Sequence, residues 1–205
     1  MIVAIVGIDG CGKTTQAQML VERLKCTGYD AVYVRPVYAI LRCLTGGQNL
    51  HALPVSPRKV RVSRASSGFG KLLLPAMGVA SYFYAFASYI FIKYLLGRNK
   101  IVVCDRYFYQ FFYDNFGGLS KTMAGLLPRP GVIFYLNSEI NVLQARMTSS
   151  FDVEVVQSYY RSVIEMLNAL SVRHGFVEIN AQLNKEQIND EIFNYLCKKL
   201  NFGER

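Results

Sequence analysis

A segment near the N-terminus combines glycines, a lysine and a threonine at a spacing suited to holding phosphate groups. It reads Gly7-Ile8-Asp9-Gly10-Cys11-Gly12-Lys13-Thr14. Its glycines let backbone N–H groups point inward and surround phosphate oxygens. The lysine can reach terminal phosphates, and the threonine hydroxyl is a ligand for Mg²⁺. Because an apolar run precedes the segment and a helical pattern follows it, we expect a cradle for a nucleoside triphosphate, here called the phosphate loop.

Charged residues also follow two other apolar runs. Asp105 and Arg106 come directly after Ile101–Cys104, and Arg35 comes directly after Ala31–Val34. A carboxylate in such a position can hold Mg²⁺ through water or orient a phosphate acceptor. A guanidinium offers a planar fork to two phosphate oxygens. Each residue also has a simpler alternative. Asp105 could cap the next helix, Arg106 could form a surface ion pair, and Arg35 could be a solvated loop residue.

The elements that must position these residues alternate along the chain. Strands are expected at 2–8, 31–34, 101–105, 132–136 and 176–179. Helices are expected at 14–25, 75–96, 107–116, 139–147, 153–172 and 185–200, with short helical pieces around 38–44. This alternation predicts an α/β fold, a three-layer α/β/α sandwich around a five-stranded parallel sheet. Ligands of such sheets bind at the carboxyl ends of the strands, where the charged residues fall.

Composition limits the classes of protein and partner. With 205 residues, 52% of them apolar, the chain is expected to form one domain, 1–205, with a single large core. Its net charge of +9 favours anionic partners such as nucleotides. We expect no nucleic-acid surface, because the basic residues are not interleaved with aromatics in a stripe. The five cysteines form no CxxC pair and no leader pattern is seen, which predicts a cytoplasmic protein.

The segment 72–92 contains no formally charged residue and is long enough to span a bilayer. Pro75 and Gly78 interrupt it early, and the serine- and glycine-rich run 66–70 is typical of a loop, so a helix is expected to begin near Pro75. A helix buried on most sides of a soluble protein is also apolar all round, and we favour that interpretation. A subunit interface or a face on a membrane surface is the alternative.

The phosphate loop and the run Ile101–Tyr107, IVVCDRY, together resemble the thymidylate kinase family of P-loop nucleoside-monophosphate kinases. The resemblance continues through 131–147, GVIFYLNSEINVLQARM, and is weakest over 36–82. It implies transfer of a phosphoryl group from ATP to a nucleoside monophosphate, dTMP in particular, with Mg²⁺ as cofactor. It also implies a homodimer, because the family dimerises through helices.

The resemblance assigns roles to individual residues. On the donor side, ATP is expected to contact Gly7, Asp9, Gly10, Cys11, Gly12, Lys13, Thr14, Thr15 and Arg146. The acceptor is expected to contact Asp9, Arg35, Tyr84 and Arg106. Lys13, Asp105 and Arg106 are the expected catalytic residues, and Mg²⁺ is expected at Thr14 and Asp105. Within the domain, 36–71 is a divergent acceptor-side segment and 148–152 a short lid. For Arg146, a solvated surface role is the alternative.

The chain departs from the family pattern in three places. Phosphoryl transfer requires extra positive charge on the migrating group, which the family supplies from the loop or from an arginine-rich lid. Here Gly10 occupies the loop position and 148–152 contains no arginine. Tyr84 lies near the place of the arginine that reads thymine, and aromatic stacking tolerates any base. Finally, Pro36-Val37-Tyr38 replaces the glycine-rich continuation after Arg35.

Three hypotheses follow from these departures. The basic residues Arg58, Arg61 and Arg64 could fold over the active site and supply the missing charge, with Arg161 as a second candidate. The acceptor could also be another nucleotide, a nucleoside or a small phosphate acceptor. A third interpretation is a catalytically weakened nucleotide-binding protein whose apolar helix binds a partner or a membrane.

Overall fold

The computed structural model describes residues 1–44, 68–138 and 153–203. The sheet is formed by β1 (Ile2–Val6), β2 (Ala31–Val34), β3 (Ile101–Asp105), β4 (Val132–Asn137) and β5 (Val177–Asn180). All pairs are parallel, in the order β2-β3-β1-β4-β5. The expected five-stranded parallel sheet is therefore confirmed.

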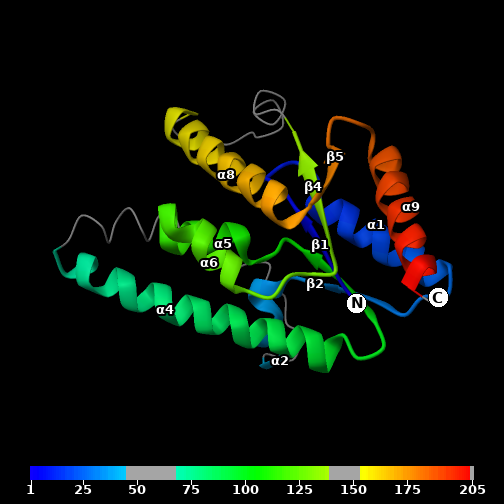
Figure 1. Cartoon of the computed structure of the whole chain (residues 1–205), viewed down its shortest axis with the longest axis horizontal. Coiled ribbons are helices and arrows are strands. Elements are labelled where there is room, and N and C mark those ends of the chain that lie inside the picture. Colours follow the sequence, from blue (N-terminus) through cyan, green and yellow to red (C-terminus); the bar gives the residue numbers. More distant parts are fainter. Residues whose placement is uncertain (45–67, 139–152, 204–205) are drawn as a thin grey trace.

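The helices of the described residues are α1 (Lys13–Cys26), η1 (Pro36–Tyr38), α2 (Ala39–Leu44), α4 (Gly68–Phe91), the π-helical η3 (Ile92–Leu96), α5 (Phe108–Phe116), η4 (Gly117–Leu119), α6 (Ser120–Leu126), α8 (Val153–His174) and α9 (Lys185–Gly203). In Figure 1, α1 and α9 lie on one side of the sheet, and α5, α6 and α8 on the other. Helix α4 packs along α5 as the outermost element of that side. The three layers of the predicted sandwich are thus in place.

The sheet order determines where the site forms. Strand β1 lies between β3 and β4, with Val3, Ala4 and Ile5 fully buried. In the register of β1 with β3, Ile5 lies opposite Asp105. The phosphate loop after β1 and the end of β3 are therefore neighbours at the carboxyl edge of the sheet, as the alternation of strands and helices predicted.

Three elements differ from the sequence expectation. Strand β1 ends at Val6, because the chain turns at Gly7 with φ +151°. Helix α4 begins at Gly68 rather than near Pro75, so the proline lies inside the helix. A proline costs about 3 kcal/mol and a glycine about 1 kcal/mol inside a helix, amounts that a long helix can offset. Helix α6 was not expected, and the helix predicted at 139–147 lies outside the described residues.

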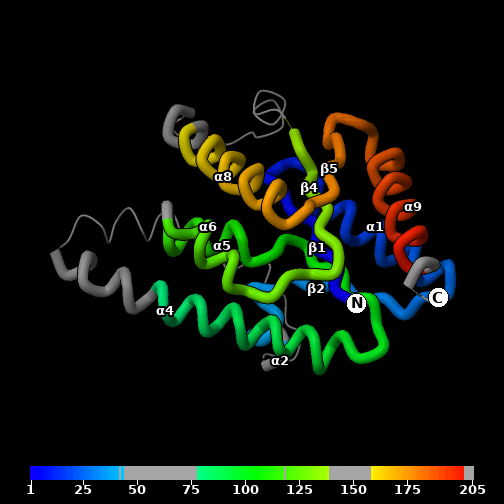
Figure 2. Tube along the Cα trace, viewed as in Figure 1, coloured from blue at the N-terminus to red at the C-terminus, as the bar shows by residue number. Residues whose placement is uncertain are grey.

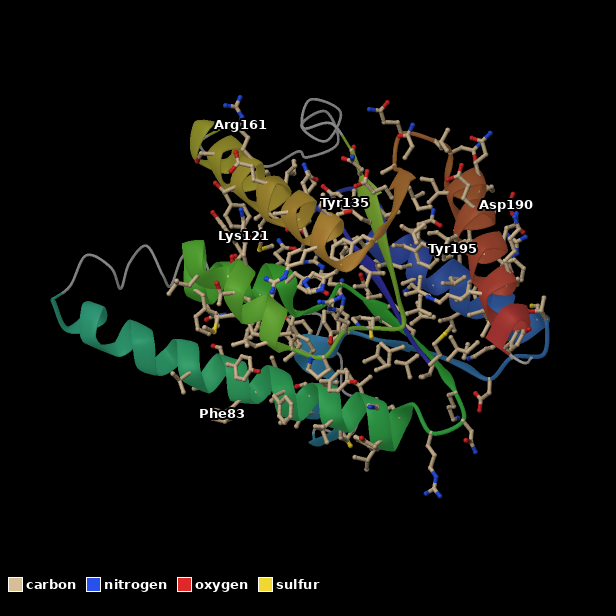
Figure 3. The ribbon with its side chains drawn as sticks, in the orientation of Figure 1. Phe83, Lys121, Tyr135, Arg161, Asp190 and Tyr195 are labelled. Atoms are coloured by element: carbon tan, nitrogen blue, oxygen red, sulfur yellow. The ribbon has the colours of Figure 1, made fainter. Side chains whose placement is uncertain are left out.

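One face of α4 is apolar and exposed, contrary to the prediction that this segment is buried on most sides. The residues along that face are Val79, Phe83, Phe86 and Ile90, and Tyr94 continues it on η3. Phe83 is 66% exposed and points away from the body of the protein in Figure 3. The opposite face is buried, with Ala85 and Ser88 fully inaccessible. Helix α4 lies at the outer edge of the described elements (Figure 2), so packing covers only its inner side.

The same helix is also the candidate for a membrane span. By length and composition, residues 78–96 are long and apolar enough to cross a bilayer, and 22% of that stretch is buried inside the protein. Uniform apolarity favoured burial on most sides, since sequence periodicity alone does not distinguish a core helix from one with a second apolar face. This segment therefore has one buried face and one exposed apolar face.

Candidate active site

The phosphate loop depends on glycines at two positions for different reasons. At Gly7, a Cβ atom would lie 2.7 Å from Cys11 Sγ and 2.8 Å from the Leu136 carbonyl oxygen, so only glycine fits. Gly12 caps the start of α1 in the left-handed region, at φ +93°. A Cβ there would meet nothing within 4 Å among the described residues. The loop therefore leaves space in front of the positive end of the α1 dipole, where anions bind.

Lys13 lies inside this loop. Its side chain is almost fully buried, and Nζ donates a hydrogen bond of 2.5 Å to the Ile8 carbonyl oxygen. The ammonium also lies 3.4 Å from Asp9 Oδ1. An ammonium held by oxygen atoms of the phosphate loop is a suitable contact for phosphate oxygens.

Asp105, fully buried at the end of β3, accepts three hydrogen bonds on a single oxygen. Thr14 Oγ1, Tyr33 Oη and Arg35 Nε donate to Oδ2 at 2.8, 2.6 and 2.9 Å. Burial tends to raise the pKa of this carboxyl group, but the donors from Tyr33, Arg35 and Thr14 lower it below its usual value. Asp105 is therefore a carboxylate at neutral pH.

The other carboxylate oxygen of Asp105 is well suited to a metal ion. Oδ1 is buried and has no hydrogen-bond partner among the described residues, which is costly for a charged acceptor. It belongs to the same carboxylate that holds the Thr14 hydroxyl. Mg²⁺ prefers oxygen ligands and is commonly held by one or two protein oxygens with substrate phosphates and water. Thr14 and Asp105 therefore fit the ion expected from the sequence.

Asp9 joins the phosphate loop to Arg106. Arg106 Nη2 lies 3.0 Å from Asp9 Oδ1, and Gln110 Nε2 donates to Oδ2 at 3.3 Å. Burial tends to raise the pKa of Asp9, but Lys13, Arg106 and the Gln110 amide lower it below its usual value. The Arg106 Nε atom is buried without a hydrogen-bond partner in the described part of the chain. The Arg106 side chain is nevertheless 42% exposed, so other N–H groups of the guanidinium can reach a ligand.

The backbone of Arg106 is held in an unusual conformation. Its φ is +70°, in the left-handed region, which costs a residue with a side chain about 1–3 kcal/mol. Its N–H donates to the Ile5 carbonyl oxygen at 3.0 Å, so the chain stays joined to β1 through this turn. Backbone strain of this kind concentrates at functional sites, which supports a role for Arg106 in binding.

The remaining predicted residues lie in different places. Arg35 contacts Asp105 and, through Nη2, Thr14 Oγ1 at 3.2 Å. Tyr84 on α4 donates to the Val37 carbonyl oxygen at 2.5 Å, and Thr15 is exposed on the first turn of α1. Arg161 is exposed and projects outward from α8 in Figure 3. Arg146, Arg58, Arg61, Arg64 and the segment 148–152 lie outside the described residues.

Two residues of the site were not found from the sequence. Tyr33 is bonded to Asp105, and Gln110 connects Asp9 with Tyr159 Oη on α8, at 3.4 Å. Each had a signal in the sequence. Tyr33 lies two residues before Arg35, a spacing that places both side chains on the same side of an extended chain. Gln110 is a polar residue in an apolar helix, four positions after Arg106. Tyr159 in turn donates to Asp114 Oδ1 at 2.6 Å.

Comparison with known proteins gives a consistent result. Residues 5–41 match the family model described as thymidylate kinase. A probable thymidylate kinase of Thermococcus onnurineus is 34% identical over 206 residues, covering 94% of this chain and 95% of the relative. The thymidylate kinases of an Exiguobacterium species and of Halothermothrix orenii are 28% and 26% identical, covering 99% and 94% of this chain and 97% and 94% of the relatives.

Proposed function

Because the chain belongs to the thymidylate kinase family, we propose that it transfers the terminal phosphoryl group of ATP to dTMP, giving dTDP and ADP. The observation that supports this most directly is the arrangement of Asp105. It holds Thr14 of the phosphate loop through one oxygen and keeps the other buried and unpartnered within the described residues. A phosphate loop beside such a carboxylate is the arrangement that phosphoryl transfer with a metal ion requires.

On the donor side, the loop amides and the start of α1 would surround the phosphates of ATP, and Lys13 would contact the terminal ones. Thr14 would hold Mg²⁺ directly and Asp105 would hold it through water. The ion supplies positive charge to the phosphate oxygens during transfer. Arg146 is proposed as a further contact of the donor nucleotide.

On the acceptor side, Arg106 would hold the monophosphate with N–H groups of its guanidinium that do not face Asp9. Asp9 keeps Arg106 and Lys13 close to each other, so the two substrates would meet between these side chains. Catalysis would then consist mainly of positioning and charge stabilisation. Arg35 and Tyr84 complete the proposed acceptor contacts.

A different acceptor is the second candidate, and Tyr84 is the observation behind it. The family's thymine-reading arginine is absent near this position, and the Tyr84 hydroxyl is already bonded to the Val37 carbonyl oxygen. The ring face of Tyr84 could stack on a base, but stacking does not distinguish thymine from other bases. The acceptor could accordingly be another nucleotide, a nucleoside or a small phosphate acceptor.

A panel of acceptors tests both candidates. ADP release would be measured with ATP, Mg²⁺ and dTMP, dUMP, CMP or the corresponding nucleosides, with Lys13→Met as the inactive control. The highest kcat/KM with dTMP is the expected result. A higher kcat/KM with another acceptor would show that this acceptor, rather than dTMP, is the substrate. Binding of ATP without transfer to any acceptor would favour a nucleotide-binding protein over an enzyme.

We also propose a cytoplasmic homodimer formed through α4. The exposed apolar residues Val79, Phe83, Phe86 and Ile90 follow one another at intervals of three or four positions, so they form one stripe along α4, and Tyr94 on η3 lies four positions further. An exposed apolar face of this length is uncommon on a monomer. A second copy of α4 would cover it with matching apolar side chains.

A further inference from the structure

We propose that Arg35 is an exchangeable cation of the metal site, which Mg²⁺ displaces and which then binds the acceptor phosphate. Binding of the metal–nucleotide complex and binding of the acceptor would thereby favour each other. The acceptor half of this inference rests on the proposed function. The metal half rests on the contacts of Arg35 alone.

The contacts of Arg35 coincide with the metal-binding groups. Its Nε donates to Asp105 Oδ2 at 2.9 Å, and its Nη2 donates to Thr14 Oγ1 at 3.2 Å. These are the two side chains whose oxygens fit Mg²⁺. A guanidinium that touches both therefore lies where the positive charge of the metal would be required.

Charge balance makes the two cations competitors. Asp105 provides one negative charge, while Thr14 and Tyr33, which also contact its Oδ2, are neutral. Mg²⁺ and a guanidinium held by the same carboxylate repel each other in a partly buried site, where screening by water is weak. The phosphates of a nucleotide add negative charge, but Lys13 and the loop amides already face them.

Arg35 can leave without dismantling the site. Its side chain is 27% exposed, so the guanidinium borders solvent, whereas the Asp105 side chain is fully buried. After Arg35 departs, Tyr33 and Thr14 still donate to Asp105 Oδ2 and hold the carboxylate in its orientation. The backbone of Arg35 is extended, at φ −98° and ψ 104°, just before η1.

The chain next to Arg35 leads to the acceptor side. Two residues further, the Val37 carbonyl oxygen accepts the hydrogen bond of Tyr84, an expected acceptor contact. Arg35, which contacts the metal-binding groups, is thus joined by two residues of chain to a contact of Tyr84. A guanidinium released from Asp105 can offer its fork to the acceptor phosphate. Because coupling is reciprocal, an acceptor that holds Arg35 must also tighten metal binding.

Replacing Arg35 by methionine tests the inference, because it predicts opposite changes at the two sites. Methionine keeps much of the length and none of the charge. With ADP present and no acceptor, Mn²⁺ binding followed by electron paramagnetic resonance should become about fivefold tighter. In calorimetry with ADP and Mg²⁺, dTMP should bind about tenfold more weakly. In the unsubstituted protein Mg²⁺ should tighten dTMP binding by about fivefold, and this effect should vanish in the variant.

Controls separate this role from a structural one. Arg98→Met, at an exposed arginine before β3, should change none of these values. Arg35→Gln, a milder substitution that also removes the charge, should show the same directions if the methionine variant folds poorly. Urea unfolding midpoints of all variants would be compared.

Weaker or unchanged Mn²⁺ binding in both Arg35 variants would overturn the inference. Such a result would favour an Arg35 that stays beside the metal and acts on the transferred group. If Mn²⁺ binds more tightly but the unsubstituted protein does not bind dTMP, the metal half stands, and the acceptor half falls with the proposed function.

Discussion

An alanine at Gly12 should separate the stability of the phosphate loop from its ability to bind phosphate. Gly12 has φ +93°, and an added Cβ would touch none of the described atoms within 4 Å. The change should therefore cost only backbone strain, about 1–2 kcal/mol in unfolding free energy. Because Gly12 is the N-cap residue of α1, we expect the methyl group to crowd the neighbouring amides that would face phosphates. Loss of two such hydrogen bonds corresponds to about 3 kcal/mol, or about a hundredfold in the Kd for ATP.

The chain offers a matched control at the other end of the same helix. Gly28, just after α1, has φ +88°, and its added Cβ would likewise have no described neighbour within 4 Å. Gly28→Ala should lose the same 1–2 kcal/mol and bind ATP normally. Urea unfolding and calorimetry with ATP and Mg²⁺ would measure both properties. Normal ATP binding by a folded Gly12→Ala protein would refute the assigned position of the phosphates.

Three further changes test other parts of the structure. Asp105→Asn should lower turnover by about 10²–10³ in the ADP-release assay, since it removes the charge facing the metal; near-normal turnover would exclude this role. Burial and the nearby Arg129 and Arg173 lower the pKa of His174, so stability should fall as the pH drops below about 6.5, where the unfolded chain takes up the proton first. In urea unfolding from pH 5 to 8, the unfolding free energy of His174→Phe should fall less at low pH than that of the unsubstituted protein. Equal pH dependence in the two proteins would contradict the role of His174. Phe83→Lys should convert a dimer into a monomer in analytical ultracentrifugation, whereas an unchanged mass would place any interface elsewhere.

The phosphate loop and the sheet could be predicted because their signals are local. The glycine spacing, Lys13 and Thr14 lie within one short segment, and strands β1 to β4 are largely apolar runs with β-branched residues. The parallel arrangement then places Asp105 beside the loop without further information, because carboxyl ends of parallel strands share one edge.

The connections between side chains could not be predicted, because they join distant residues. The bond between Tyr33 and Asp105 spans 72 positions, and that between Asp9 and Gln110 spans 101. Arg35 was expected to face the acceptor, a role that stays a prediction, but its contacts with Asp105 and Thr14 appear only in three dimensions. The exposed apolar face of α4 was given only as the alternative, because uniform apolarity does not distinguish a helix buried on most sides from a helix with an exposed apolar face.

The fate of the transferred phosphoryl group tests the central claim most directly. ATP labelled with ³²P at its terminal phosphate would be incubated with dTMP and Mg²⁺, and the products separated by thin-layer chromatography. The account predicts that the label moves into dTDP with the unsubstituted protein and stays in ATP with Lys13→Met. Label found in inorganic phosphate alone, or retained in ATP with the unsubstituted protein, would contradict it.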